Sequence, residues 1–216
     1  MEYCAGGDLK GYCKNRKITE DMAFNIIRQV ARGFEEMNKL GIIHRDLKPA
    51  NILVHNEHFK LCDFGFAKYF GEAGRMARTC VGTPIYMSPQ VLKQKSYTTK
   101  TDIWSLGVLF YELLFGRLPF SGYNEDEMYK NIIKNGINVP QCSREAENIL
   151  RGTLVVEETK RWGWKELLDD LFGTSNQPQL QPQSQPGIKR VTGTGNRPVS
   201  SNGNVFYERD KDKRTY

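Results

Sequence analysis

Several features are scarce or absent in this 216-residue sequence, and their absence excludes whole classes of protein. Apolar residues make up 39% of the chain, but nowhere do eighteen of them run together, so we expect no membrane span. The opening residues, Met1 to Cys4, lack the basic end and the apolar stretch of a secretory signal. The five cysteines include no C-x-x-C pair, which argues against a zinc ribbon or a redox dithiol. We therefore expect reduced thiols in a cytoplasmic or nuclear protein.

Basic residues outnumber acidic ones mainly at the C-terminal end of the chain. Residues 174–216 hold seven basic and three acidic residues, and thus +4 of the formal net charge of +6. No face rich in Lys and Arg recurs in the rest of the chain, so we expect no nucleic-acid partner. Nucleic-acid binding through the basic segment is kept only as a third functional hypothesis.

Composition changes sharply near Gly173. Residues 174–187 contain five glutamines and three prolines, with Leu180 as the only large apolar residue. Such a segment buries too little surface to offset its conformational entropy. The sequence therefore predicts a folded domain over residues 1–172 and a disordered Gln/Pro-rich and basic tail over residues 173–216.

Two long helices are predicted in the folded part. Thr19 is a candidate N-cap for the first, whose apolar residues recur at three- and four-residue spacing from Met22 to Met37. Gly41 suits the left-handed position that ends such a helix. The second helix, residues 101–115, is apolar on every side and is expected at the centre of the domain.

The remaining pattern predicts a small hairpin and shorter helices. Apolar runs at residues 52–54 and 60–62 are separated by the polar residues 55–58, which is typical of a hairpin. Further helices are expected at residues 124–135, 143–154 and 164–171.

One polar string carries most of the chemical information. Asp46 and Asn51 lie five residues apart on a predicted loop, and the hairpin that follows would bring Asp63 back beside Asn51. Carboxylate and amide oxygens together form a site for a hard cation such as Mg²⁺. Lys48, two residues after Asp46, offers a positive charge for a phosphate and leaves Asp46 free to act as a base.

Taken in order, these residues resemble the eukaryotic protein kinases. His44 to Asn51 reads H-R-D-L-K-P-A-N, and Asp63-Phe64-Gly65 follows, as in the kinase pattern H-R-D-L-x-x-x-N and D-F-G. Lys48 and the string Gly82 to Pro89 resemble the Ser/Thr type. The resemblance covers residues 1–172 and is looser to two subgroups, the calcium/calmodulin-dependent and the Unc-51-like kinases. It implies a protein-kinase-like (α+β) fold, with a mainly α large lobe and small β-hairpins.

The resemblance also implies a role for each matching residue in the transfer of phosphate from ATP to Ser/Thr hydroxyls of protein substrates. Asp46 would accept the proton of the substrate hydroxyl, and Lys48 would steady the transferring phosphate. Asn51 and Asp63 would hold Mg²⁺. The ATP contacts would come from the hinge-like start of the chain and the first hairpin strand, through Glu2, Cys4, Asp8 and Leu53.

Other matching residues would have structural or regulatory roles. Arg45 would pair with a phosphate on Thr79, added by an upstream kinase or by autophosphorylation, and this pair would order the segment between them. Asp102 would accept hydrogen bonds from the catalytic-loop backbone. The full set comprises His44, Arg45, Phe64, Gly65, Thr79, Thr83, Gln90, Asp102 and Arg161.

The sequence departs from the kinase pattern in two places. No G-x-G-x-x-G string precedes the hinge-like start, and neither do the strand lysine and helix glutamate of an N-terminal lobe. We therefore expect a fragment without that lobe, which by itself binds ATP weakly. The alternative function is a non-catalytic module that binds a protein partner. In addition, Gln90 stands where the family has a glutamate that pairs with Arg161, which would weaken that contact.

Overall fold

The computed structural model describes residues 3–14, 16–69 and 82–173. All of these residues belong to one compact unit. Its helices and strands, in chain order, are α1 (Leu9–Lys14), α2 (Glu20–Lys39), β1 (Ile42–Ile43), β2 (Ile52–His55), β3 (His58–Leu61), β4 (Lys68–Tyr69), α3 (Pro89–Leu92), α4 (Lys100–Phe115), α5 (Glu125–Asn135), α6 (Arg144–Thr153) and α7 (Trp164–Phe172). Short 3-10 turns occupy Pro49–Asn51 and Pro84–Tyr86.

Helix α2 confirms the amphipathic pattern read from the sequence. The Oγ1 atom of Thr19 accepts a hydrogen bond from the backbone N of Met22 at 3.3 Å, so Thr19 is the N-cap. The apolar face of the helix is buried, and Gly41 follows its end with a φ of 66°. This face packs against α4, α7 and β3.

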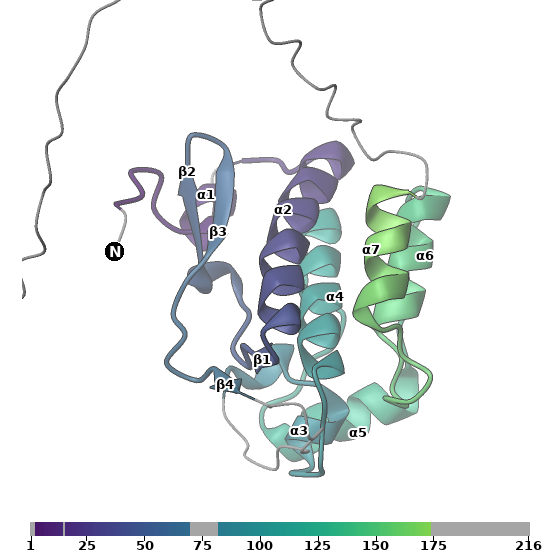
Figure 1. The fold of residues 1–216 in the computed structure, drawn as a ribbon. Helices are drawn as coiled ribbons and strands as arrows, with labels where there is room; N and C mark the ends of the chain where they lie inside the picture. The colour runs from purple at the N-terminus through teal and green to yellow at the C-terminus, as the bar shows by residue number, and fades with distance from the viewer. Residues whose placement is uncertain (1–2, 15, 70–81, 174–216) are drawn as a thin grey trace, which may run out of the picture. The chain divides into compact units, whose positions relative to one another are not determined.

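Helix α4 lies at the centre of the described fold, as its all-round apolar sequence predicts. Figure 1 shows α2 and α4 running side by side, with α6 and α7 beyond them and the β2–β3 hairpin beside α2. Trp104, Val108 and Phe110 of α4 are fully buried. The helix begins one residue before the predicted start and ends at Gly116, which takes the left-handed conformation.

The predicted hairpin is confirmed as the antiparallel pair β2–β3. Ile52 lies opposite Leu61, and His55 lies opposite His58. The two residues between the strands both have positive φ values, 47° and 62°, as a tight two-residue hairpin turn requires. A second pair, β1–β4, joins Ile42 to Tyr69 across the chain and was not predicted, because strands of two residues have no detectable periodicity.

The shorter helices lie where the sequence predicts them, within a residue or two. Helices α1 and α3 were missed, because six and four residues are too few to show a helical apolar pattern.

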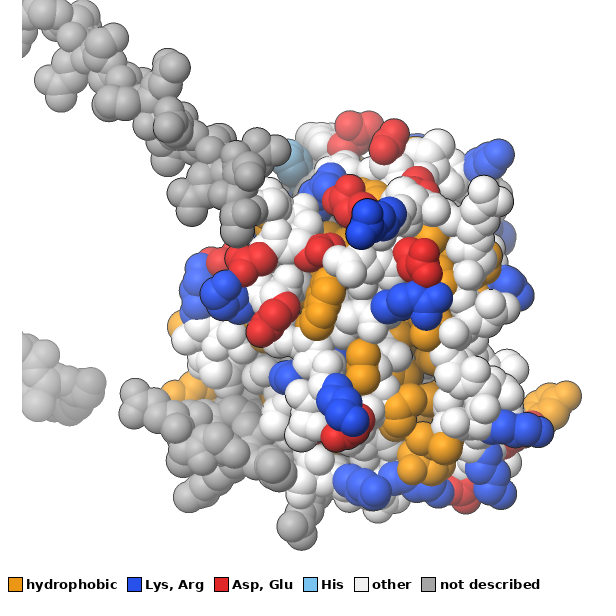
Figure 2. Space-filling view, turned by 90° about the vertical axis from the view of Figure 1, so that its right-hand side faces the viewer, with side chains coloured by type: hydrophobic (Ala, Val, Ile, Leu, Met, Phe, Trp, Pro, Cys, Tyr) orange, Lys and Arg blue, Asp and Glu red, His pale blue; other side chains and the backbone are white. Residues whose placement is uncertain are grey.

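On the face shown in Figure 2, charged side chains of both signs are interspersed with apolar ones. Within the described residues, no helix has the length and apolar character needed to cross a membrane.

Close packing between α6 and the loop before α7 generates a prediction about stability. A Cβ atom on Gly152 would lie 2.2 Å from the indole ring of Trp162, so Gly152→Ala forces the ring or the helix to move. We expect the free energy of unfolding to fall by about 1–3 kcal/mol in a urea titration. The matched control is Arg151→Ala, because the neighbouring Arg151 is exposed and loses only a surface ion pair with Glu147. Equal stability of the two variants would contradict the packing argument.

Candidate active site

A buried carboxylate on α4 holds the loop that contains the candidate catalytic residues. Asp102 Oδ2 accepts a hydrogen bond from the backbone N of His44 at 2.9 Å, and its Oδ1 accepts one from the backbone N of Arg45 at 3.0 Å. Burial raises the pKa of Asp102, and these two N–H donors oppose that shift. Arg45 adopts a φ of 70°, which a non-glycine residue avoids without such anchoring.

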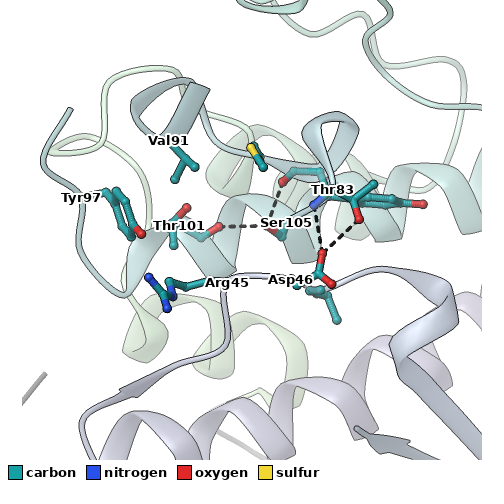
Figure 3. Close-up of a pocket in the computed structure, with 10 residues that line it drawn as sticks. Arg45, Asp46, Thr83, Val91, Tyr97, Thr101 and Ser105 are labelled. Carbon is teal, nitrogen blue, oxygen red and sulfur yellow. Dashed lines mark hydrogen bonds between the residues drawn. The ribbon is translucent and has the colours of Figure 1, made fainter. Parts of the chain in front are cut away.

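The carboxylate of Asp46 lies at the convergence of four hydrogen-bond donors. Its Oδ1 accepts from the backbone N and the hydroxyl of Thr83, at 2.9 Å and 3.0 Å. Its Oδ2 accepts from Lys48 Nζ at 2.7 Å and from Asn51 Nδ2 at 3.0 Å. Figure 3 shows Thr83 directly above Asp46, with both of its contacts drawn. The loop that contains Asp46 and the Gly82–Pro89 segment therefore meet at the two carboxylate oxygens of Asp46.

Oxygen atoms suited to Mg²⁺ are present at the two predicted positions. The backbone N of Cys62 donates to the backbone O of Asn51 at 3.0 Å, which brings the neighbouring Asp63 beside Asn51. Asn51 uses its Nδ2 atom to bind Asp46, so its amide oxygen faces away from those bonds. The exposed Asp63 carboxylate accepts one hydrogen bond, from the backbone N of Gly65 at 3.3 Å. One amide and one carboxylate oxygen fit a hard cation that also binds phosphate and water.

The predicted nucleotide-contacting residues also lie together, apart from Glu2, which is outside the described residues. Asp8 forms a β-bridge with Leu53, and the backbone of Gly6 donates to Val54 at 3.0 Å. Cys4 precedes this short ladder, and its backbone O accepts a hydrogen bond from the backbone N of Gly7 at 3.3 Å across a turn. The Asp8 carboxylate accepts a hydrogen bond from the backbone N of Gly11 at 2.7 Å, a contact at the start of α1 that the sequence reading did not anticipate.

His44 and Phe64 connect the catalytic loop to the segment after β3. The Nε2 atom of His44 donates to the backbone O of Cys62 at 3.1 Å, and its ring lies 5.3 Å from that of Phe64, which is 52% exposed. Arg45 Nε donates to the backbone O of Phe66. Thr79, whose phosphate is predicted to pair with Arg45, lies outside the described residues, so that pair stays a prediction.

The contact between Gln90 and Arg161 is present as a neutral-to-charged hydrogen bond. Arg161 is 1% exposed, and its Nη2 donates to Gln90 Oε1 at 2.9 Å. Its Nε and Nη1 atoms donate to the backbone O of Val155 and Lys100, at 3.0 Å and 2.9 Å. Burial lowers the pKa of Arg161 to about 10. Backbone carbonyls thus supply much of the compensation that a carboxylate would provide.

Sequence reasoning missed two polar contacts behind the site. The hydroxyl of Tyr86 donates to Glu112 at 2.6 Å, and Ser105 Oγ donates to the backbone O of Tyr86 at 2.8 Å. Both tie the segment after Thr83 to α4 (Figure 3 shows the Ser105 contact). No local signal in the sequence pairs Tyr86 with Glu112, because the two residues are 26 positions apart and follow no motif spacing.

Together, the helical core, the small sheets and this polar loop define a protein-kinase-like fold with a kinase-like site. The family model for the protein kinase domain matches residues 1–172, and the chain belongs to the protein kinase family.

Similar proteins narrow the type to Ser/Thr kinases of the Unc-51 and Atg1 kind. The chain is 34% identical to the serine/threonine-protein kinase atg1 of Dictyostelium discoideum, over 78% of this chain and 26% of that protein. It is 34% identical to unc-51 of Caenorhabditis elegans, over 95% of this chain and 25% of that protein. It is 38% identical to human ULK1, over 72% of this chain and 16% of that protein. The chain thus spans about a quarter or less of these relatives.

The anchoring of the catalytic loop by Asp102 generates a second prediction. In Asp102→Asn, the amide NH2 group faces one of the two backbone N–H donors, so a buried donor loses its acceptor. We expect the free energy of unfolding to fall by about 2–4 kcal/mol and hydrogen exchange of the backbone amides in residues 44–51 to accelerate. The same change at the exposed Asp126, which only loses an ion pair with Lys93, should alter stability much less. If exchange in the loop stayed unchanged, the anchoring role of Asp102 would be wrong.

A third prediction concerns Gln90. In Gln90→Ala, Arg161 loses an acceptor and the backbone O of Val156 loses a donor that lies 2.7 Å away. We expect a loss of about 1–3 kcal/mol in the free energy of unfolding. A double-mutant cycle with Arg161→Met measures how much of this loss belongs to the pair. A coupling free energy near zero would mean that the backbone carbonyls alone compensate Arg161.

Proposed function

We propose that this chain is part of a protein Ser/Thr kinase that transfers the γ-phosphate of ATP to hydroxyl groups of protein substrates. The observation that carries the proposal is the Asp46 carboxylate, buried to 3% exposure and held by Thr83, Lys48 and Asn51. A carboxylate fixed by several donors on different segments is suited to orient one incoming hydroxyl group.

The geometry indicates how a substrate hydroxyl would reach Asp46. An ionised carboxylate has about four acceptor positions, and four donors already occupy those of Asp46. The substrate hydroxyl must therefore replace one donor. The hydroxyl of Thr83 and the ammonium group of Lys48 can rotate away, whereas the backbone N of Thr83 cannot. The displaced Lys48 would then carry its charge toward the transferring phosphate.

Asn51 and Asp63 supply the oxygen atoms that would hold Mg²⁺ in this proposal. The ion, when bound, neutralises charge on the nucleotide phosphates and orients them. Cys4, Asp8 and Leu53 would contact the nucleoside part of ATP from the hinge-like segment. We also propose phosphorylation at Thr79, by an upstream kinase or by the protein itself, and a cytoplasmic or nuclear location.

The second candidate function is a non-catalytic module that binds a protein partner. The presence of Gln90, where the kinase family has a glutamate, favours it. The intact set of His44, Asp46, Lys48, Asn51 and Asp63 favours catalysis, since a module that only binds a partner has no use for this combination.

The test is a phosphate-transfer assay with the 216-residue chain, Mg²⁺, labelled ATP and a Ser/Thr-containing protein such as myelin basic protein. We expect slow transfer to serine and threonine that disappears in Asp46→Asn, because the amide cannot accept the hydroxyl proton. A matched control is Asp169→Asn, which changes the same residue type at an exposed position of α7 and should leave transfer unchanged. Absence of transfer by the unmodified chain, or transfer that survives Asp46→Asn, would instead support the binding module.

A further inference from the structure

A large cavity opens near the candidate active site, between α1 and the C-terminal end of α4. Its volume is about 670 Å³. Pro49, three residues after Asp46 on the catalytic loop, forms part of its wall. Glu112 forms another part and is hydrogen-bonded to Tyr86, on the segment whose Thr83 contacts Asp46. Pro49 and the Glu112–Tyr86 hydrogen bond therefore connect this cavity to the segments that carry Asp46 and Thr83.

The rim of this cavity is strongly basic. Lys10, Lys14, Arg16 and Lys17 line it, and all four side chains belong to exposed residues. Lys10 and Lys14 are four residues apart on α1, so they project from the same side of that helix. None of the three lysines forms an ion pair or a hydrogen bond within the described part of the chain. Arg16 stacks on the ring of Tyr12 at 4.2 Å, which orients its guanidinium group.

The cavity contains a single carboxylate to oppose this charge, and that carboxylate is engaged. Glu112 accepts the hydrogen bond from Tyr86 Oη at 2.6 Å, so one of its carboxylate oxygens is already bound within the protein. Burial, and to a smaller extent Glu112, raises the pKa of the Cys13 thiol to about 11, which keeps that group neutral at pH 7. Four basic side chains against one carboxylate leave the cavity with a net positive charge.

Apolar side chains form the inner part of the same cavity. Ile18 comes from the loop before α2, and Leu113, Leu114 and Phe115 come from the last turn of α4. Leu114, Phe115 and Ile18 are only partly buried, so they offer apolar surface to an occupant. A ligand that fits both parts must combine an apolar group with several negative charges.

We infer that this cavity docks a segment of a protein substrate in which acidic residues flank an apolar side chain. The apolar residue would lie against the end of α4, and its acidic neighbours would pair with the lysines of the rim. The inference rests on the proposed kinase function, because Pro49 at the cavity wall belongs to the same loop as the hydroxyl-accepting Asp46.

The cavity could in principle bind either another protein or the C-terminal segment of this chain, and charge distinguishes the two. Residues 174–216 carry seven basic and three acidic residues, so their sign matches that of the rim and disfavours docking there. An acidic segment of a different protein can pair with the lysines of the rim and is therefore the occupant that we propose.

The test measures binding of short fluorescent peptides to the 216-residue chain by anisotropy, without ATP. One peptide has a Leu-Glu-Asp-Glu core and contains no serine or threonine. A second replaces the acidic residues with lysines, and a third replaces the leucine with glycine. We expect the first peptide to bind at least about tenfold more tightly than either of the others, and added salt to weaken it.

Charge reversal on the chain locates the binding site. Lys14→Glu combined with Lys17→Glu should weaken binding of the acidic peptide by about tenfold, since two attractions become repulsions. The matched control combines Lys130→Glu with Lys134→Glu on α5, which makes the same change in net charge at exposed positions elsewhere. This control should change binding by less than about threefold, and circular dichroism checks that both variants fold.

Three outcomes would overturn the inference. These are equal binding of the acidic and lysine peptides, equal weakening by the two double variants, and no binding at all. Because the assay uses neither ATP nor an acceptor hydroxyl, peptide binding can succeed while phosphate transfer fails, and the reverse. Failure of the docking inference is therefore distinguishable from failure of the proposed kinase function.

Discussion

The two hydrogen bonds that the Asp102 carboxylate accepts from the backbone N–H groups of His44 and Arg45 are the constraint on which the candidate active site depends. They connect the central helix α4 to a loop that has little regular structure of its own. They also stabilise the left-handed backbone of Arg45, which in turn directs Asp46 toward Thr83. A loop residue with a single intended orientation needs such support from a rigid element. Helix α4 provides it because it is buried on all sides.

Two chain segments meet at the carboxylate of Asp46. Lys48 and Asn51 approach it from its own loop, and Thr83 approaches from the segment before α3. That segment is fixed from behind by Ser105 and Glu112 of α4, through Tyr86. Helix α4 therefore positions both the loop that contains Asp46 and the segment that contains Thr83. A change in the position of α4 would move both segments.

The replacement of glutamate by Gln90 shows how a buried charge can be accommodated without an ion pair. Arg161 distributes its N–H groups over Gln90 and the backbone carbonyls of Lys100 and Val155. Each of these is a charge-assisted hydrogen bond, but none carries a full negative charge. Burial lowers the pKa of Arg161, and these hydrogen bonds satisfy its guanidinium group in the buried site. The weaker contact expected from the sequence stays a prediction, whereas the compensating carbonyls were visible only in the structure.

The sequence by itself determined the long helices, the β2–β3 hairpin and the residue types of the site. Periodicity and capping act over a few neighbouring residues, so Thr19 and Gly41 mark the ends of α2 without any tertiary information. The spacing of Asp46, Asn51 and Asp63 likewise predicted that their polar groups lie close together. Only the tertiary structure decided the β1–β4 pairing, the link from Tyr86 to Glu112 and the basic cavity beside α1. These features join residues that are far apart in the chain, and their contacts are selected by how the buried faces of the helices pack, which no local pattern encodes.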